Sequence, residues 1–223
     1  MIEVLYEDNH LIAVNKKSGD IVQGDKTGDT PLSEHVKNYI KKKYNKPGEV
    51  FLGTIHRLDR PTSGIVLYAR TSKALSRMNE QFRNKEVQKT YLAVVDNIPP
   101  NNSGILENFL QKNQKQNKSY VTKGNNGKHA ILHYKRLKKL DNFYLIEIKP
   151  QTGRHHQIRV QLANIGCVIK GDLKYGAKRS NKDASIHLLA QKLEFIHPVK
   201  KESITILAPA PKDSVWDLSL IHI

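Results

Sequence analysis

The sequence predicts an α+β fold, because strand-like and helix-like segments follow one another without the strict alternation of a parallel α/β sheet. Short runs of β-branched and aromatic residues recur between turn residues. Other segments repeat their apolar residues every three or four positions, as one face of a helix does. With 223 residues and 38% hydrophobic content, the chain can bury a core as one large domain or as two lobes.

The N-terminal part of the chain predicts two strands and a helix. We expect the strands at residues 2–7 and 11–14, because turn residues separate two short apolar runs. Residues 31–44 predict a helix with one apolar stripe and a lysine run at 41–43, which suits the negative end of a helix dipole. A solvated helix end explains these lysines better than contact with phosphates does.

The next segments predict a buried strand and a second helix. Residues 65–69 (IVLYA) read as a strand that is buried on both faces. We expect Ser72 to cap the following helix, in which Leu75, Met78 and Phe82 recur at helical spacing. Met78 and Phe82 are therefore expected in the core.

The middle of the chain changes in composition. Residues 100–128 are rich in Asn, Gln, Lys, Gly and Ser, so we expect a mobile insertion between strands. Strand character returns at residues 143–148 and again at 204–207. Between these strands we expect a helix through Ile158, Leu162 and Ile165 that ends at Gly166.

The charge of the chain indicates a polyanionic partner. There are 37 Lys and Arg residues against 21 Asp and Glu, which gives a formal net charge of +16 and a pI near 9.8. Nucleic acid is the natural candidate, since an anionic membrane would require a basic amphipathic helix or a lipidation signal, and the sequence has neither. Without a signal peptide or an apolar segment of spanning length, we expect a cytoplasmic protein.

Metal and cofactor signals are missing from the sequence. There is no P-loop, no GxGxxG and no cysteine pair, so we expect neither a metal nor a cofactor. Cys167 is the single cysteine, and its apolar neighbours indicate an inert packed thiol. We expect His155 and His156, as neighbours, to point in different directions, and at least one of them to orient a loop by hydrogen bonding.

A polar turn at residues 56–64 (HRLDRPTSG) is the strongest candidate for a catalytic site. It places the carboxylate of Asp59 between Arg57 and Arg60, directly before the buried strand at 65–69. Loops carried by rigid elements often hold catalytic residues. An exposed Arg-Asp-Arg ion network is the alternative, and composition alone does not choose between the two.

Together with two later segments, this turn resembles the RluA-type family of RNA pseudouridine synthases. Residues 89–95 (KTYLAVV) resemble the family's lysine-x-tyrosine strand, and residues 151–159 (QTGRHHQIR) resemble its TGRxHQIR motif, which Gly-Asp at 171–172 and Tyr-Gly at 175–176 continue. The resemblance covers residues 4–211. It implies a mixed, largely antiparallel sheet with flanking helices and a central catalytic cleft, in a single catalytic domain over residues 1–223.

The resemblance also implies an activity and a substrate. The family isomerises uridine in RNA to pseudouridine without a metal or a cofactor, so we expect ribosomal or transfer RNA as the partner, no membrane and no obligate protein partner. Many members carry an S4-type RNA-binding domain ahead of the catalytic one, and we expect none here because about 55 residues precede His56. The 100–128 segment and the basic surface would then bind the RNA.

Three catalytic roles follow from the resemblance. Asp59 is expected to be the catalytic carboxylate, and Arg154 its ionic partner, which would keep the carboxylate charged in a dry pocket. Tyr91 is expected to stack on the uridine that is flipped out of the RNA. Attack at C1′, addition at C6 and removal of the C2′ proton all stay open as the role of the carboxylate.

Four further residues are expected to bind the substrate. Arg57 would fill the gap left by the flipped base or bind a phosphate, and Thr62 belongs to the same motif. Leu188 resembles the leucine that packs on the uracil, with an ordinary core position as the alternative. For Arg159, packing inside the fold and phosphate binding both stay open.

The chain departs from the family pattern at two positions, and two other functions are alternatives to the one that the resemblance implies. Lys17 stands where a proline is usual and Leu189 where a histidine is usual, which bears on specificity more than on activity. A non-catalytic RNA-binding protein is disfavoured by the intact set of expected catalytic residues. A nuclease acting through His56 or the histidine pair is disfavoured by the lone carboxylate of the turn.

Overall fold

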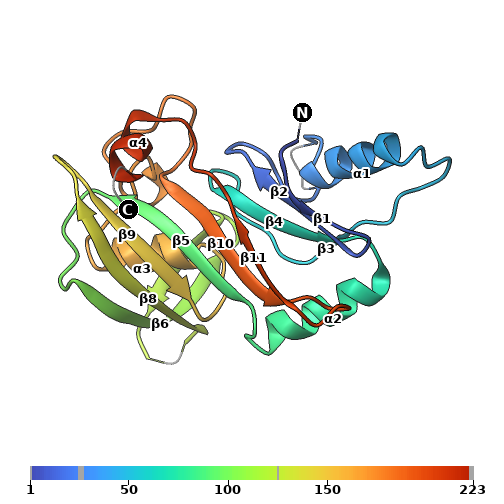
Figure 1. Cartoon of the computed structure of the whole chain (residues 1–223). Coiled ribbons are helices and arrows are strands. Elements are labelled where there is room, and N and C mark those ends of the chain that lie inside the picture. Colours follow the sequence, from blue (N-terminus) through green and yellow to red (C-terminus); the bar gives the residue numbers. More distant parts are fainter. Residues whose placement is uncertain (1, 25–27, 125, 221–223) are drawn as a thin grey trace. The chain divides into compact units, whose positions relative to one another are not determined.

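A computed structural model describes residues 2–24, 28–124 and 126–220 (Figure 1). The chain divides into two compact units. The first comprises Met1–Gln88 and Ala190–Pro209, and the second comprises Lys89–Leu189 and Ala210–Ile223. That the two units act as one catalytic domain stays a prediction.

The first unit is built from antiparallel strands and two helices. Strand β2 pairs with β1 on one side and with β4 on the other, β3 also pairs with β4, and β10 pairs with β11. The elements of this unit are β1 (Val4–Glu7), β2 (Leu11–Lys16), α1 (Leu32–Lys43), β3 (Gly53–Thr54), β4 (Ser63–Ala69), α2 (Ser72–Arg83), most of β10 (Leu188–Ile196) and β11 (Ser203–Leu207).

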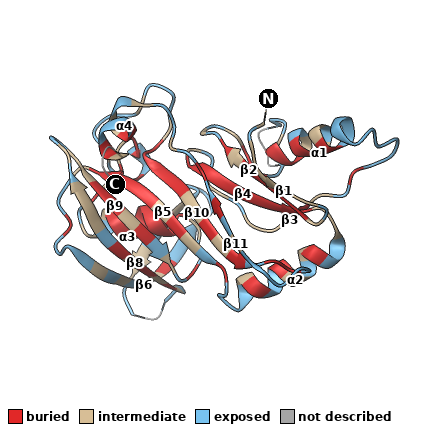
Figure 2. Ribbon diagram, in the orientation of Figure 1, coloured by how far each residue is buried: buried red, intermediate tan, exposed pale blue. Residues whose placement is uncertain are grey.

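Helix α1 and strands β2 and β4 share one core. Leu32, Val36 and Ile40 project from α1 at helical spacing and pack with residues of both strands, including Val14 and Val66. Every residue of β4 is buried, as Figure 2 shows. The N-terminal strand pair, the first helix and the buried strand are therefore confirmed.

Helix α2 begins one residue away from its expected cap. Thr71, not Ser72, is the N-cap: its backbone is extended and its hydroxyl accepts a hydrogen bond from the amide of Ala74 at 3.2 Å. Only the residue before the first helical turn can present its side chain to that amide. Met78 is fully buried, as expected.

The second unit contains a five-stranded antiparallel arrangement in the order β5-β9-β8-β6-β7. Its helices are α3, α4 and a short 3₁₀ helix, η1. The elements are β5 (Gln88–Val95), β6 (Ser103–Asn113), β7 (Lys118–Thr122), β8 (Lys128–Lys139), β9 (Tyr144–Pro150), α3 (Gln157–Asn164), η1 (Leu173–Tyr175) and α4 (Ser214–Leu220).

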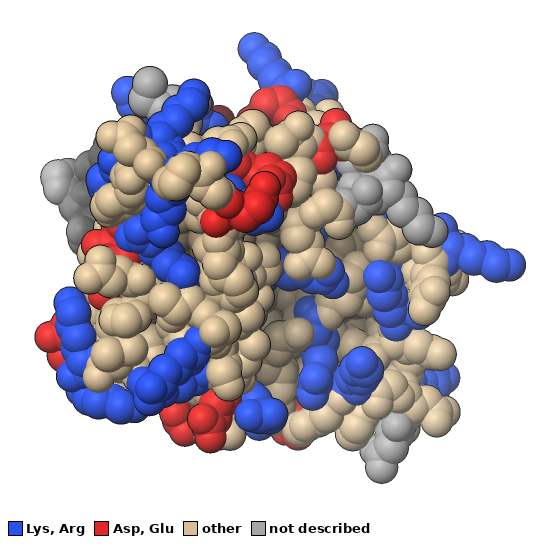
Figure 3. All heavy atoms as spheres, turned by 90° about the vertical axis from the view of Figure 1, so that its right-hand side faces the viewer, with Lys and Arg blue, Asp and Glu red and all other residues tan. Residues whose placement is uncertain are grey.

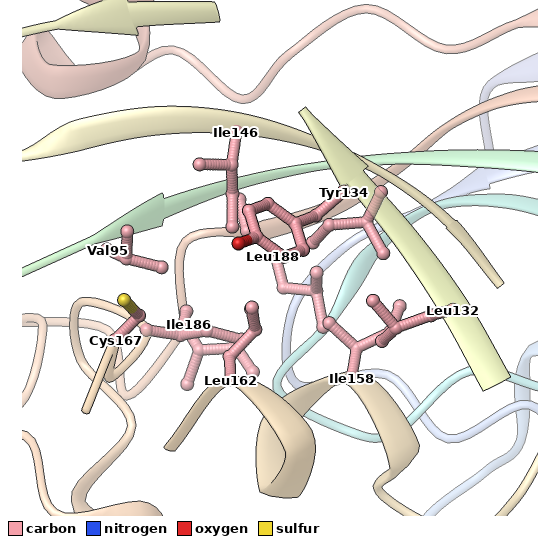
Figure 4. Packing of buried hydrophobic residues seen from close by; sticks show 12 residues of the cluster. Val95, Leu132, Tyr134, Ile146, Ile158, Leu162, Cys167, Ile186 and Leu188 are labelled. Atoms are coloured by element: carbon pink, nitrogen blue, oxygen red, sulfur yellow. The ribbon is translucent and has the colours of Figure 1, made fainter. Parts of the chain in front are cut away.

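The core of the second unit lies between this sheet and α3. Figure 4 shows Ile158 and Leu162 of α3 packed against side chains from the strands, among them Val95, Leu132 and Ile146. The helix expected through Ile158 and Leu162 is confirmed. None of the helices among the described residues is long and apolar enough to cross a membrane.

The segment at 100–128, expected as a mobile insertion, instead forms the paired strands β6 and β7. Strand β6 pairs with β8 from Ser103↔Lys135 to Leu110↔Lys128, and with β7 on its other edge. Its polar residues occupy exposed positions, while Leu110 and Ser119 are buried. The backbone pairing that holds such a polar strand is not encoded in local hydrophobicity. The predicted α+β class with a largely antiparallel sheet is confirmed.

Candidate active site

Asp59 lies in the first unit, on the segment that joins β3 to β4, and is half-buried. The amide of Thr62 donates to the carbonyl oxygen of Asp59 at 3.0 Å, which closes a tight turn behind the carboxylate. The turn leads directly into β4, whose residues are all buried. A rigid element therefore carries the expected catalytic residue, as the sequence predicts.

A buried lysine holds the backbone of this turn. The ammonium of Lys16, at the end of β2, donates to the carbonyl oxygens of Lys17 at 2.9 Å, Arg60 at 3.0 Å and Thr62 at 2.8 Å. Burial lowers the pKa of Lys16 to about 8, although the charges of two carboxylates, one of them Asp59, favour its protonated form. Sequence reasoning missed this role, although a lysine two positions after the apolar run of residues 11–14 was a signal for it.

Gly64 fixes where the turn ends. Its φ of +114° lies in the region that favours glycine, and a Cβ at this position would come within 2.3 Å of the carbonyl oxygen of Ala190. Backbone therefore approaches backbone here more closely than any side chain would permit. The glycine in the HRLDRPTSG turn has a steric function in placing β4 against Ala190.

The remaining side chains of the turn have separate surroundings. Arg57 is exposed, whereas Thr62 is buried. Arg60 forms an exposed ion pair with Asp29 at 2.7 Å. The ring of His56 accepts a hydrogen bond from the amide of Leu67 at 3.1 Å and stacks on an aromatic ring of α2, so it is tied into the framework.

Tyr91 lies in the second unit, on β5, where it pairs with Ile148 of β9. Because paired residues of an antiparallel sheet project to the same face, Tyr91 lies on the side that faces the core. It is half-buried at the edge of that core. An aromatic ring that is partly packed and partly accessible suits a stacking surface.

Arg154 follows β9 in a turn that Gln157 organises. The Gln157 side chain accepts from the Arg154 amide at 2.9 Å and from the Thr152 hydroxyl at 2.8 Å, and it donates to the Ile131 carbonyl at 3.0 Å. The Arg154 side chain is exposed, and its Nε donates to the carbonyl oxygen of His129 at 2.8 Å. Its pairing with Asp59 stays a prediction.

The histidine pair departs from the expected geometry. The rings of His155 and His156 stack with centroids 3.8 Å apart, instead of pointing in different directions. His156 has a φ of +52°, and this left-handed conformation turns its side chain toward that of its neighbour. His155 Nδ1 lies 2.8 Å from the hydroxyl of Ser119, and His156 Nδ1 lies 2.9 Å from the hydroxyl of Tyr175. The expected loop-orienting hydrogen bond is therefore present.

Burial keeps His156 neutral. Desolvation, reinforced by the nearby charge of Arg159, lowers the pKa of His156 to about 2. A ring that is neutral at pH 7 is not the imidazolium that would serve as the acid of a histidine-pair nuclease. The stacked pair is a structural element that joins β7 to the start of α3.

The last two expected substrate contacts are buried. Arg159 and Asp172 are 5% and 1% exposed and form two parallel bonds of 2.7 and 2.8 Å, which favours the packing alternative for Arg159. Leu188 is 3% exposed and belongs to the core in Figure 4, where Cys167 also lies. Burial raises the pKa of the Cys167 thiol to about 11, in line with an inert residue.

No group of three or more His, Cys, Asp or Glu side chains is arranged to hold a metal ion within the ranges that the structure describes.

Comparison with known proteins defines the class to which this chain belongs. The model of the family described as RNA pseudouridylate synthase matches residues 10–164. The chain is 36% identical over 214 residues to the ribosomal large subunit pseudouridine synthase C of Buchnera aphidicola subsp. Baizongia pistaciae (strain Bp), covering 92% of this chain and 66% of that enzyme. It is 30% identical over 246 residues to the tRNA pseudouridine synthase C of Pasteurella multocida (strain Pm70), covering 99% of each.

The chain therefore belongs to the RNA pseudouridylate synthase family, which confirms the family predicted from the sequence. A solved structure of human RNA Pseudouridylate Synthase Domain Containing 4 superposes with a TM-score of 0.80 at 24% identity, over 97% of this chain and 91% of that one. This likeness confirms the fold. The chain spans 66% of the length of the Buchnera enzyme, so a third of that relative has no counterpart in this alignment.

Proposed function

We propose that this chain is an RNA pseudouridine synthase that isomerises uridine to pseudouridine with Asp59 as its catalytic carboxylate. The observation that carries the proposal is the Asp59 turn, whose backbone Lys16 and Gly64 hold in one conformation. The reaction breaks the bond from N1 to C1′, turns the uracil and joins C5 to C1′. The C5 proton leaves and N1 gains a proton, so no oxidant, reductant or energy source is required.

The carboxylate of Asp59 has to stay ionised to act as a nucleophile or a base. Desolvation by a bound nucleotide would favour the neutral acid, and nearby cations oppose this. Lys16 supplies one positive charge from within the first unit. We propose that Arg154 supplies the second: its Nε is held by the carbonyl of His129, which leaves the terminal nitrogens to meet a carboxylate.

Tyr91 is proposed as the stacking surface for the extruded uracil. Removing a uridine from its stack costs a few kcal/mol, and a base stacked on an aromatic ring regains about 1–3 kcal/mol. Arg57 is exposed beside the Asp59 turn, so we assign it the RNA contact. Thr62, Leu188 and Arg159 are buried and would support the site from within the fold.

Ribosomal or transfer RNA is the proposed substrate class. The relatives named above are a large-subunit ribosomal enzyme and a tRNA enzyme, and both classes of RNA stay open for this chain. The net charge of +16 supports a polyanionic substrate. Figure 3 shows a face on which Lys and Arg side chains are more numerous than Asp and Glu. The expected cytoplasmic location and the expected lack of a protein partner stay predictions.

Release of tritium from RNA labelled at C5 of uridine tests this function. We expect wild-type protein to release tritium from bulk ribosomal or transfer RNA, and Asp59→Asn to release none while binding the RNA normally. The matched control is Asp29→Asn, which removes an exposed carboxylate of the same unit and should keep activity. Equal release by wild type and Asp59→Asn would refute the assigned role, and RNA binding without release by any variant would support a binding protein.

A further inference from the structure

Lys89 is a half-buried lysine of the second unit to which the proposed mechanism assigns no role. It lies on β5 two residues before Tyr91, so the two side chains project to the same face of the sheet. Its ammonium nitrogen is 3.9 Å from the point that a Cβ at Gly153 would occupy. Gly153 directly precedes Arg154, so Lys89 lies between the proposed stacking residue and the turn that carries the proposed partner of Asp59.

The ammonium of Lys89 has no partner within the part of the chain that the structure describes: no residue there accepts a hydrogen bond from it or forms an ion pair with it. Burial alone lowers its pKa. The contrast with Lys16 is informative, because that buried ammonium has three carbonyl acceptors. A desolvated cation is costly until an anion arrives, so the Lys89 site is arranged for a ligand that is not part of the second unit.

The approach to Lys89 is open on the side of Gly153. The φ of Gly153 is not in the left-handed region, so its backbone conformation does not require glycine. A Cβ there would lie in ordinary van der Waals contact with the lysine nitrogen, with no other atom nearby, and a larger side chain would cover that nitrogen. An exposed glycine next to an unpaired ammonium leaves room for a ligand oxygen to reach that nitrogen.

We propose that Lys89 forms a phosphate subsite for the nucleotide whose base stacks on Tyr91. This inference rests on the proposed function, because it takes RNA as the ligand. A base that lies on the Tyr91 ring brings its own phosphates within the length of one nucleotide, and Lys89 is two residues, or about 7 Å, along the same strand. A single ammonium that meets a phosphate adds affinity without reading sequence.

The test is the salt dependence of RNA binding by Lys89→Met and Lys89→Arg in the full chain, with unfractionated transfer RNA as the probe. Loss of one phosphate contact should reduce the slope of log K against log salt by about 0.7–0.9. We expect this reduction in Lys89→Met, with a higher KM and a kcat within about twofold of wild type at saturating RNA. Lys89→Arg should retain the slope, because it keeps the charge.

Lys149→Met is the matched control. Lys149 lies on β9 directly after Ile148, the partner of Tyr91, so its side chain projects to the face opposite that of Tyr91 and Lys89. An equal change of slope in Lys149→Met would show that the loss of any positive charge explains the effect, and this would overturn the subsite. A fall of kcat in Lys89→Met with an unchanged slope would also overturn it, because Lys89 would then act on the chemistry or on Asp59.

Two readouts keep this proposal separate from the proposed function and from folding. Binding slopes are measured without turnover, so they do not depend on the isomerase activity. If the wild type releases no tritium but Lys89→Met still has a smaller slope than the wild type, the isomerase is refuted and the subsite is supported. Lys89→Met removes an unpaired desolvated charge, so its Tm should be equal to or above that of wild type. A lower Tm with unchanged RNA binding would make Lys89 a structural residue and refute the subsite.

Discussion

Replacing Lys16 by methionine should damage catalysis far more than stability. The ammonium of Lys16 is the donor that the carbonyl oxygens of Lys17, Arg60 and Thr62 share. Two of these carbonyls keep a second donor: Arg60 the amide of Gly19 at 2.9 Å, and Lys17 the amide of Asp20 at 3.4 Å. The variant therefore leaves the Thr62 carbonyl without the lysine, and an unsatisfied buried acceptor costs about 1–3 kcal/mol.

The loss of this hydrogen bond is opposed by a second effect, the removal of a buried charge. The pKa of Lys16 falls from 10.5 to about 8 on burial, and a difference of about 2.5 pH units corresponds to about 3.4 kcal/mol of cost for the charged form at neutral pH. Methionine removes this cost and has nearly the same volume. The free energy of unfolding should therefore stay the same or rise by up to about 2 kcal/mol.

Activity should respond differently, because the three carbonyls define the path of the backbone on which Asp59 is carried. A displacement of about 1 Å at a reacting group can cost about 100-fold in rate. We expect Lys16→Met to lower kcat for tritium release by about that factor, with RNA binding nearly unchanged and a Tm close to that of wild type. A variant with normal kcat, or one whose activity falls only in proportion to its unfolded fraction, would refute this reasoning.

Three further predictions concern the supports of the site. Gly64→Ala should unfold at a lower denaturant concentration, because the strained backbone alone costs about 1–3 kcal/mol and the new Cβ would meet the carbonyl of Ala190; an unchanged midpoint would contradict the steric role. The pKa of His156 is about 6.5 in the unfolded state and about 2 in the folded state, so between these values the unfolded state binds more protons. Stability should therefore fall as pH decreases through this window, by up to about 1.4 kcal/mol per pH unit. In denaturation measured as a function of pH, His156→Gln should weaken that fall. Arg159→Met or Asp172→Asn alone should destabilise by about 3–5 kcal/mol, and the double variant by less than the sum; additive losses in this cycle would argue against a coupled buried pair.

The elements that the sequence predicted are those with strong local signals. The run at residues 65–69 is apolar throughout and forms the fully buried β4, and the spacing of Leu32, Val36 and Ile40 corresponds to one face of α1. Strands β6, β7 and β8 were not predicted, because their residues are largely polar and their pairing is a long-range property. Helix α4 was likewise missed: it is short, and its Trp216 is buried only in the tertiary structure.

The candidate site also has features that local sequence predicts and features that it does not. The motif around Asp59 identified the turn, and the paired residues of β5 and β9 place Tyr91 on the core side. The role of Lys16 was missed, because lysine is rarely buried and nothing local shows that three carbonyls converge on it. The stacking of His155 on His156 was missed because it depends on a left-handed backbone at His156, which non-glycine residues seldom adopt.

The lysine content of the hairpin formed by β6 and β7 has a consequence for solubility. Strand β7 ends the order of strands in the second unit, so it is an edge strand, and the Tyr175 hydroxyl bonds the amide and the carbonyl of its Ser119 on that edge. It is only five residues long, and Lys118 begins it, while Lys115 and Lys123 lie just outside its ends. Charge of this kind hinders edge-to-edge association between copies of a protein. Neutralising these lysines to weaken RNA binding would therefore also remove a protection against aggregation, so loss of activity in such variants has to be separated from loss of the monomer.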